Sequence, residues 1–199
     1  MAKQWPESVR RSGKLLILAS PSATAGWSVA LERAIKEFNR ATYARKLALR
    51  CELTTKESEA QLTFGVGTKD QFQSSVHGTT ELSSLEQDDT IVKADILVHP
   101  NPQVTVFRKK AGSKEYEDVA RDAGEGVRVV IIAHEFIHAC GLEKHSNNES
   151  PDVFYSPLEP NGGDRPQDDY MKVPITKGIR LPPVVISAQT ARRLQEIWS

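Results

Sequence analysis

The chain has 199 residues, of which 39% are hydrophobic and 26% charged, a composition typical of a globular protein with one hydrophobic core. Its 26 basic side chains balance its 26 acidic ones, so no overall electrostatic field favours nucleic acid or an anionic membrane as a partner. We therefore expect a single domain over residues 1–199 that acts as a monomer and binds neither of these partners.

The first apolar run, Leu15 to Ala19, is too short for the core of a signal peptide and far too short to span a bilayer. The two cysteines, Cys51 and Cys140, do not make a disulfide framework, and their apolar neighbours favour buried thiols. These observations predict a cytoplasmic protein, although secretion stays open for a chain from which a leader has been removed.

The first part of the chain predicts three strands and one helix. Residues 14 to 19 form the continuous apolar run of a buried strand, and residues 27 to 38 place apolar side chains at helical spacing. Residues 47 to 53 and 62 to 66 alternate apolar and polar side chains, as half-buried strands do. We therefore expect a sheet backed by an amphipathic helix.

The middle of the chain predicts a polar connection at residues 68 to 90, followed by strands at 91 to 99 and 104 to 109. Pro100 and Pro102 lie between these two strands and favour a sheet edge. An edge beside a cleft offers unpaired N–H and C=O groups, so we expect an extended substrate to pair with the strand at 91 to 99.

Other features of this region give weaker signals. His77 falls in the polar connection and is interpreted as solvated, whereas His99 ends a strand beside proline, a position where histidine is more often structural or solvated than a ligand. The glycines of Gly65-Val66-Gly67 lack the spacing of a phosphate-binding loop and indicate a turn at a strand end.

The most informative stretch is a helix predicted at residues 127 to 140, which is apolar on almost every side and must therefore be buried. Helical residues advance by about 100°, so His134 and His138 lie about 40° apart, and both imidazoles can reach one metal ion. Glu135 lies about 100° round from His134. That position suits a general base acting on a water beside the metal better than a ligand.

A third zinc ligand must come from outside this helix, because catalytic zinc usually takes three protein ligands and leaves a fourth position for water. Gly141 tolerates positive φ and favours a helix end from which the chain can turn back toward the metal. His145 lies four residues beyond this turn, within reach of the ion. We assign the zinc ligands to His134, His138 and His145, with Glu143 and Glu149 as the other nearby donors.

The run HEFIHACGLEKH resembles the metzincin zinc-peptidase signature HExxHxxGxxH, with one extra residue between Gly141 and His145. The resemblance implies a cleft between a larger lobe, 1–141, and a smaller irregular lobe, 142–199. It also implies a methionine beneath the metal-binding histidines. Met171 is the candidate for that floor, and Phe154 competes with it.

The end of the chain predicts an irregular segment at residues 146 to 183, which several prolines and glycines interrupt. Ser187 is the expected N-cap of a closing helix that carries Leu194 and Trp198 on its apolar face. The order of elements indicates an α+β fold, with a mixed twisted sheet, an active-site helix, a backing helix and a smaller irregular C-terminal lobe that ends in a helix.

These features predict a zinc-dependent endopeptidase that hydrolyses peptide or protein substrates. Zinc would polarise the scissile carbonyl and lower the pKa of its water to about 7, and Glu135 would act as general base. Tyr170 and Tyr155 are candidates for steadying the oxyanion. The alternatives are a zinc hydrolase of a non-peptide amide and a non-catalytic binding protein that keeps zinc in a closed site.

Overall fold

The computed structural model describes residues 3–23, 25–73, 76–109, 111–112, 115–142, 153–155 and 184–199. Their elements, including two single 3₁₀ turns labelled η, are α1 (Glu7–Ser12), β1 (Lys14–Ala19), α2 (Ala25–Ala44), β2 (Arg50–Thr54), η1 (Glu57–Glu59), β3 (Leu62–Val66), η2 (Lys69–Gln71), β4 (Gly78–Ser84), β5 (Ile91–Val98), β6 (Gln103–Lys109), β7 (Tyr116–Asp122), α3 (Glu125–Ala139), β8 (Val153–Tyr155), β9 (Val184–Ile186) and α4 (Ala188–Trp198).

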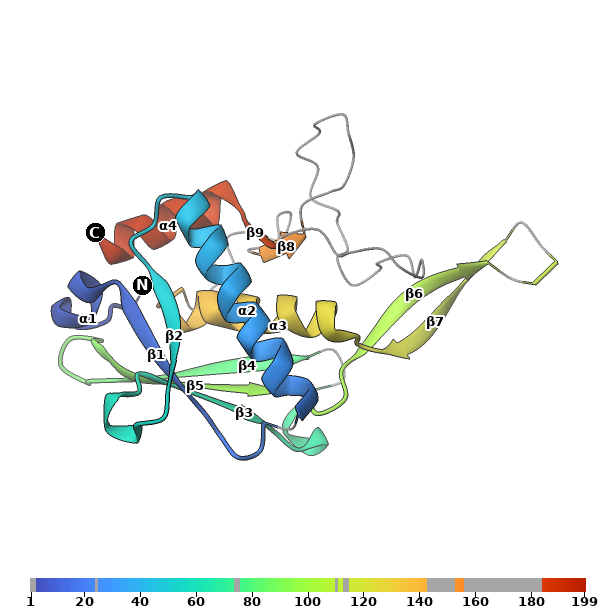
Figure 1. Cartoon of the computed structure of the whole chain (residues 1–199), viewed down its shortest axis with the longest axis horizontal. Coiled ribbons are helices and arrows are strands. Elements are labelled where there is room, and N and C mark those ends of the chain that lie inside the picture. Colours follow the sequence, from blue (N-terminus) through green and yellow to red (C-terminus); the bar gives the residue numbers. More distant parts are fainter. Residues whose placement is uncertain are drawn as a thin grey trace.

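The main sheet has five strands in the order β2-β1-β3-β5-β4 (Figure 1). The strands β2, β1, β3 and β5 are parallel, and β4 runs antiparallel to β5 at one edge. Helix α2 connects β1 to β2, which is the kind of crossover that neighbouring parallel strands require. The predicted α+β class with a mixed sheet is therefore confirmed.

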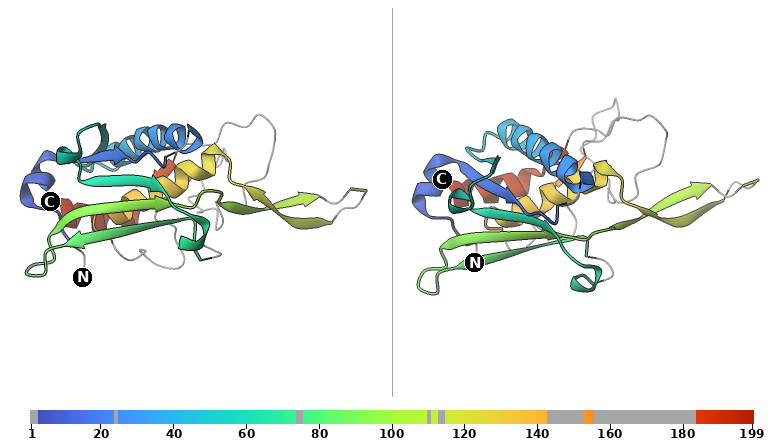
Figure 2. Two further views of the ribbon diagram at one scale, coloured as in Figure 1. Left: turned by 90° about the horizontal axis from the view of Figure 1, so that it is seen from below. Right: turned by 60° about the horizontal axis from the view of Figure 1, so that its bottom comes forward.

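Two long helices, α2 and α3, pack together beside this sheet (Figures 1 and 2). Their contact includes the rings of Phe38 and Phe136, whose centroids lie 5.4 Å apart in an edge-to-face arrangement. Helix α3 also contacts β4 and β5, so it is enclosed between α2 and the sheet. This burial explains why the sequence of α3 is apolar all round, as predicted.

Strand β4 corrects two predictions. The polar connection expected at residues 68 to 90 contains η2 and β4, and β4 forms the sheet edge. The prediction that residues 91 to 99 form an edge is wrong, because β5 pairs with β3 on one side and with β4 on the other. Every second residue of β4 is exposed, so its sequence lacks the apolar run that marks the inner strands.

Strand β6 matches the strand predicted at 104 to 109, but it belongs to a separate two-stranded ribbon. Its partner is β7, for which the charged sequence gave no prediction. The ribbon projects away from the sheet and helices (Figures 1 and 2). Pro102 lies at its base, where the Pro102 carbonyl accepts a hydrogen bond from the Ala123 N–H.

The closing helix begins as predicted, because the Ser187 side chain accepts a hydrogen bond from the Thr190 N–H at 3.1 Å. Buried side chains of β9 and α4 belong to the same hydrophobic cluster as those of β1, α2, α3 and β5. Cys51 and Cys140 are free and fully buried in that cluster, in agreement with the prediction. In the described part of the chain, no helix is long and apolar enough to cross a membrane.

Candidate metal centre

Two imidazoles meet on the side of α3 that faces β4. The Nε2 atoms of His134 and His138 lie 3.1 Å apart, and the ring planes are inclined at 78°. Two nitrogens bound to one tetrahedral zinc ion at about 2.0–2.1 Å would be separated by about 3.3 Å. The pair therefore fits zinc with little movement, as the helical spacing predicts.

The orientation of His138 is fixed by a backbone contact. Its Nδ1 lies 2.6 Å from the carbonyl oxygen of Leu142, which can only accept a hydrogen bond. The Nδ1 atom therefore carries a hydrogen, and the Nε2 atom of the same ring faces His134. A backbone carbonyl that holds the second ring nitrogen in this way is a common support for zinc-binding histidines.

Helix α3 ends where the glycine predicts. Gly141 has φ of +104°, and its N–H donates to the carbonyl of His138 at 2.9 Å. A Cβ atom at this position would also collide with the backbone carbonyl oxygen of Lys3. The turn therefore needs glycine for both conformation and space, and it delivers Leu142 to the ring of His138.

The remaining predicted donors, His145, Glu143 and Glu149, lie outside the described residues. Of the three predicted ligands, the structure thus brings together His134 and His138. Among the residues it describes, no group of three or more His, Cys, Asp or Glu side chains is arranged around one metal position. Tyr170 and Met171 also fall outside these residues, whereas Phe154 and Tyr155 contribute the backbone of β8.

Glu135 is the buried carboxylate of the site, with 5% of its surface exposed. Its Oε2 atom accepts a hydrogen bond of 2.7 Å from the Thr80 hydroxyl on β4. Its side chain also lies against Gly78, where an added Cβ would come within 2.8 Å of Oε1. The edge strand therefore positions the predicted general base. Gly78 and Thr80 carry no signal of this role in the sequence, because they fall in the segment predicted as a polar connection.

A cavity of about 410 Å³ joins these groups. Its wall on α3 consists of His134, Glu135 and His138, and its other wall is the edge strand β4, which contributes Gly78, Thr79, Thr80 and Leu82. The second edge of β4 pairs with no strand in the described part of the chain. The histidines and the carboxylate thus face a space that the outer edge of β4 borders.

Comparisons of the chain with protein-family models, with curated proteins and with solved structures found no match.

Proposed function

We propose that the protein is a zinc-dependent endopeptidase of the metzincin type. The observation that carries the proposal is the shared cavity, in which two imidazoles 3.1 Å apart and a buried carboxylate face the edge of a sheet. By itself, a pair of histidines that can bind zinc is equally compatible with a structural zinc site. A carboxylate fixed next to that pair and beside an available strand edge favours hydrolysis of an extended chain.

The metal would be held by His134 and His138 together with His145, the third predicted ligand. Bound zinc would supply Lewis acidity and a water with a pKa of about 7. Glu135 would accept a proton from the attacking water and pass it to the leaving amine. The Thr80 hydroxyl would hold the carboxylate in position through its Oε2 atom.

The substrate would lie along β4. Its main chain would pair with the edge of this strand, and the scissile bond would sit near Thr80, which contacts Glu135. Antiparallel pairing is slightly more stable per residue than parallel pairing. In that orientation the C-terminal side of the substrate runs toward Gly78, since β4 itself runs from Gly78 to Ser84.

Zinc content and hydrolysis test this proposal together. The purified protein should contain stoichiometric zinc by elemental analysis and should cleave members of a quenched-fluorescent peptide library. Glu135→Gln should abolish cleavage while zinc is retained, because the residue is assigned to proton transfer and not to coordination. Loss of zinc from this variant would contradict that role.

The alternatives give different results in the same experiment. Stoichiometric zinc without cleavage of any peptide would indicate a binding protein with a closed metal site. Cleavage of non-peptide amides without cleavage of any peptide would indicate a zinc hydrolase of non-peptide amides. Buried free thiols at Cys51 and Cys140 are compatible with the expected cytoplasmic location, which stays part of the proposal.

A further inference from the structure

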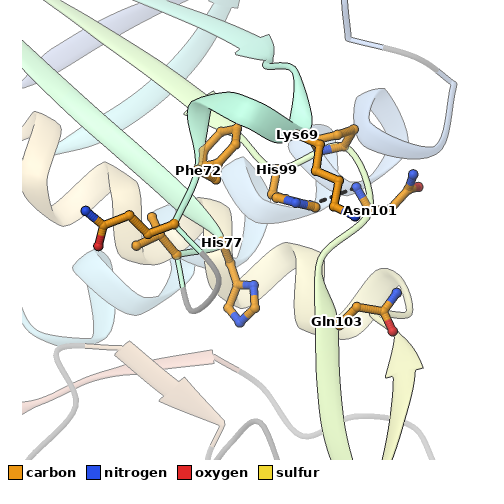
Figure 3. Close-up of a pocket in the computed structure, with 9 residues that line it drawn as sticks. Lys69, Phe72, His77, His99, Asn101 and Gln103 are labelled. Atoms are coloured by element: carbon orange, nitrogen blue, oxygen red, sulfur yellow. Dashed lines mark hydrogen bonds between the residues drawn. The ribbon is translucent and has the colours of Figure 1, made fainter.

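A second cavity, of about 430 Å³, lies beyond the carboxyl ends of the parallel strands β3 and β5 (Figure 3). Open sheets with parallel strands bind ligands at this end. The lining residues come from η2, from the segment between η2 and β4, from the connection between β5 and β6, and from the first residue of β6; they are Lys69, Phe72, Gln73, Val76, His77, His99, Pro100, Asn101 and Gln103.

Local structure holds this cavity open in a defined shape. Thr68 and Gln71 form a reciprocal capping box around η2, which fixes the backbone that carries Lys69. The rings of Phe72 and His99 meet edge to face, with centroids 5.3 Å apart. The backbone N–H of His99 donates to the backbone carbonyl of His77 at 2.9 Å, so the segment before β4 is joined to the segment after β5.

The chemistry of the lining favours a carboxylate. None of its nine residues is acidic, and Lys69 contributes a positive charge. The Nδ1 atom of His99 accepts a hydrogen bond of 3.0 Å from the Asn101 N–H, so the hydrogen of the neutral ring lies on Nε2 and that atom is a donor. Figure 3 shows Lys69, His99 and Asn101 close together at one end of the cavity. The Lys69 ammonium, the Nε2–H group of His99 and the side-chain amide of Asn101 are donors of the kind that bind a carboxylate.

The second histidine adds a neutral polar wall. Burial and the neighbouring His99 lower the pKa of His77, so its ring is uncharged near neutral pH. Lys69 is therefore the cation expected to decide the charge preference of the cavity, and a substitution at this residue should reverse that preference.

Two consecutive residues, His77 and Gly78, belong to the linings of the two cavities. His77 lines the second cavity and Gly78 lines the first. Strands rise by about 3.3 Å per residue, so His77 lies roughly 10 Å along the chain from Thr80. A substrate antiparallel to β4 would bring the residue two or three positions after its scissile bond to this point.

We propose that the cavity between η2 and His99 is a binding subsite for a carboxylate on the C-terminal side of the substrate's scissile bond. The inference rests on the proposed peptidase function. The carboxylate is either an Asp or Glu side chain or the terminal carboxylate of a short substrate, and both would use the same donors.

The test compares peptides that differ only in the second and third residues after the cleaved bond, with Glu, Gln or Lys at each position. A parallel set ends there with a free or an amidated carboxyl terminus. Dissociation constants are measured by fluorescence anisotropy on the zinc-loaded Glu135→Gln variant, and kcat/KM is measured on wild type. Wild type should prefer Glu to Gln, or the free terminus to the amide, by about threefold to tenfold.

Charge reversal supplies the decisive comparison. Lys69→Glu should make the Lys peptide bind more tightly than the Glu peptide, whereas Lys36→Glu should keep the wild-type order. Lys36 is the matched control because it is exposed on α2 and lines neither cavity.

Equal binding of the Glu, Gln and Lys peptides and of both termini would overturn the subsite, as would a preference that Lys69→Glu leaves unchanged. A preference for acidic residues that is confined to the N-terminal side of the cleaved bond would also overturn the proposed subsite. A protein that neither retains zinc nor cleaves peptides would refute the proposed function. Binding of the free and amidated peptides to the metal-free protein and to its Lys69→Glu variant would then test the cavity by itself.

Discussion

The hydroxyl of Thr80 is the contact that links the predicted general base to the edge strand. A carboxylate that accepts a hydrogen bond at 2.7 Å is held in one rotamer, so Glu135 need not be ordered when a substrate arrives. Gly78 contributes in a different way, since any larger side chain would occupy the space of the Glu135 carboxylate. Two residues of one strand face thus determine where the proposed proton acceptor lies.

Thr80→Val should lower kcat/KM for peptide hydrolysis by about tenfold, because it removes a hydrogen bond to a charged group while keeping the shape of the side chain. Zinc content should not change, since Thr80 is not a proposed ligand. Thr80→Ser keeps the hydroxyl and is the matched control. Steady-state kinetics of both variants provide the measurement, and equal losses in the two would show that the hydroxyl has no such role.

At the scale of elements, the end of α3 is held by two tryptophans from opposite ends of the chain. The Trp5 indole N–H donates to the Ala139 carbonyl at 2.8 Å, and the Trp198 indole N–H donates to the Cys140 carbonyl at 3.0 Å. The last carbonyls of a helix lack partners within it, so these buried bonds satisfy groups that would otherwise destabilise the fold. They also fix the turn that brings Leu142 to His138.

Trp5→Phe and Trp198→Phe should each lower the free energy of unfolding by about 1–3 kcal/mol, because each leaves a buried carbonyl without its donor. Both should also weaken zinc binding, since the turn at Gly141 orients His138. The control is Trp27→Phe, which removes an indole bond to Pro100 far along the chain from this turn. Urea unfolding and zinc titration test the three variants; weaker zinc binding in the control alone would contradict this account.

The sheet shows which elements a sequence can predict. Strands β1 and β3 carry fully buried side chains, namely Leu15, Ile17, Leu62 and Phe64. Their apolar patterns predicted both strands correctly. Strand β4 is half-exposed, and its position depends on pairing with β5 and packing on α3. Helix α3 was predictable because its two histidines, His134 and His138, are spaced to lie within one turn. The contact of Thr80 with Glu135 spans 55 residues and has no local signal.

At the scale of the whole molecule, one hydrophobic cluster connects the sheet, helix α3 and the C-terminal helix α4. Cys51 on β2 and Cys140 beside the end of α3 lie within it, and neither has any exposed surface. Burial raises the pKa of both thiols, so the reactive thiolate is absent from the folded protein near neutral pH.

Both thiols should therefore resist a thiol reagent under native conditions and should react together when the protein unfolds. The rate of labelling at increasing urea concentration should follow the loss of the folded state measured by circular dichroism. Mass spectrometry assigns the labelled positions. Rapid labelling of Cys140 alone under native conditions would reveal local opening of the α3 end and would contradict a single cooperative core.

Metal binding should couple the site to this core, and His145 provides the sharpest test because its position carries the extra residue relative to the metzincin signature. Zinc that binds only the folded state adds stability of RT ln(1 + [L]/Kd), about 4 kcal/mol when free zinc is about a thousandfold above Kd. A chelator should therefore lower the Tm of wild type by several degrees or more. Without chelator, His145→Ala should already have the low Tm of chelated wild type, and its Tm should change little when chelator is added, because a two-histidine site loses affinity for zinc by orders of magnitude.

His77→Ala, which alters the neighbouring cavity, should keep the chelator response of wild type. If His145→Ala instead binds zinc stoichiometrically and remains sensitive to chelator, the third ligand is another residue, and Glu149→Ala and Glu143→Ala then identify it by the same measurement.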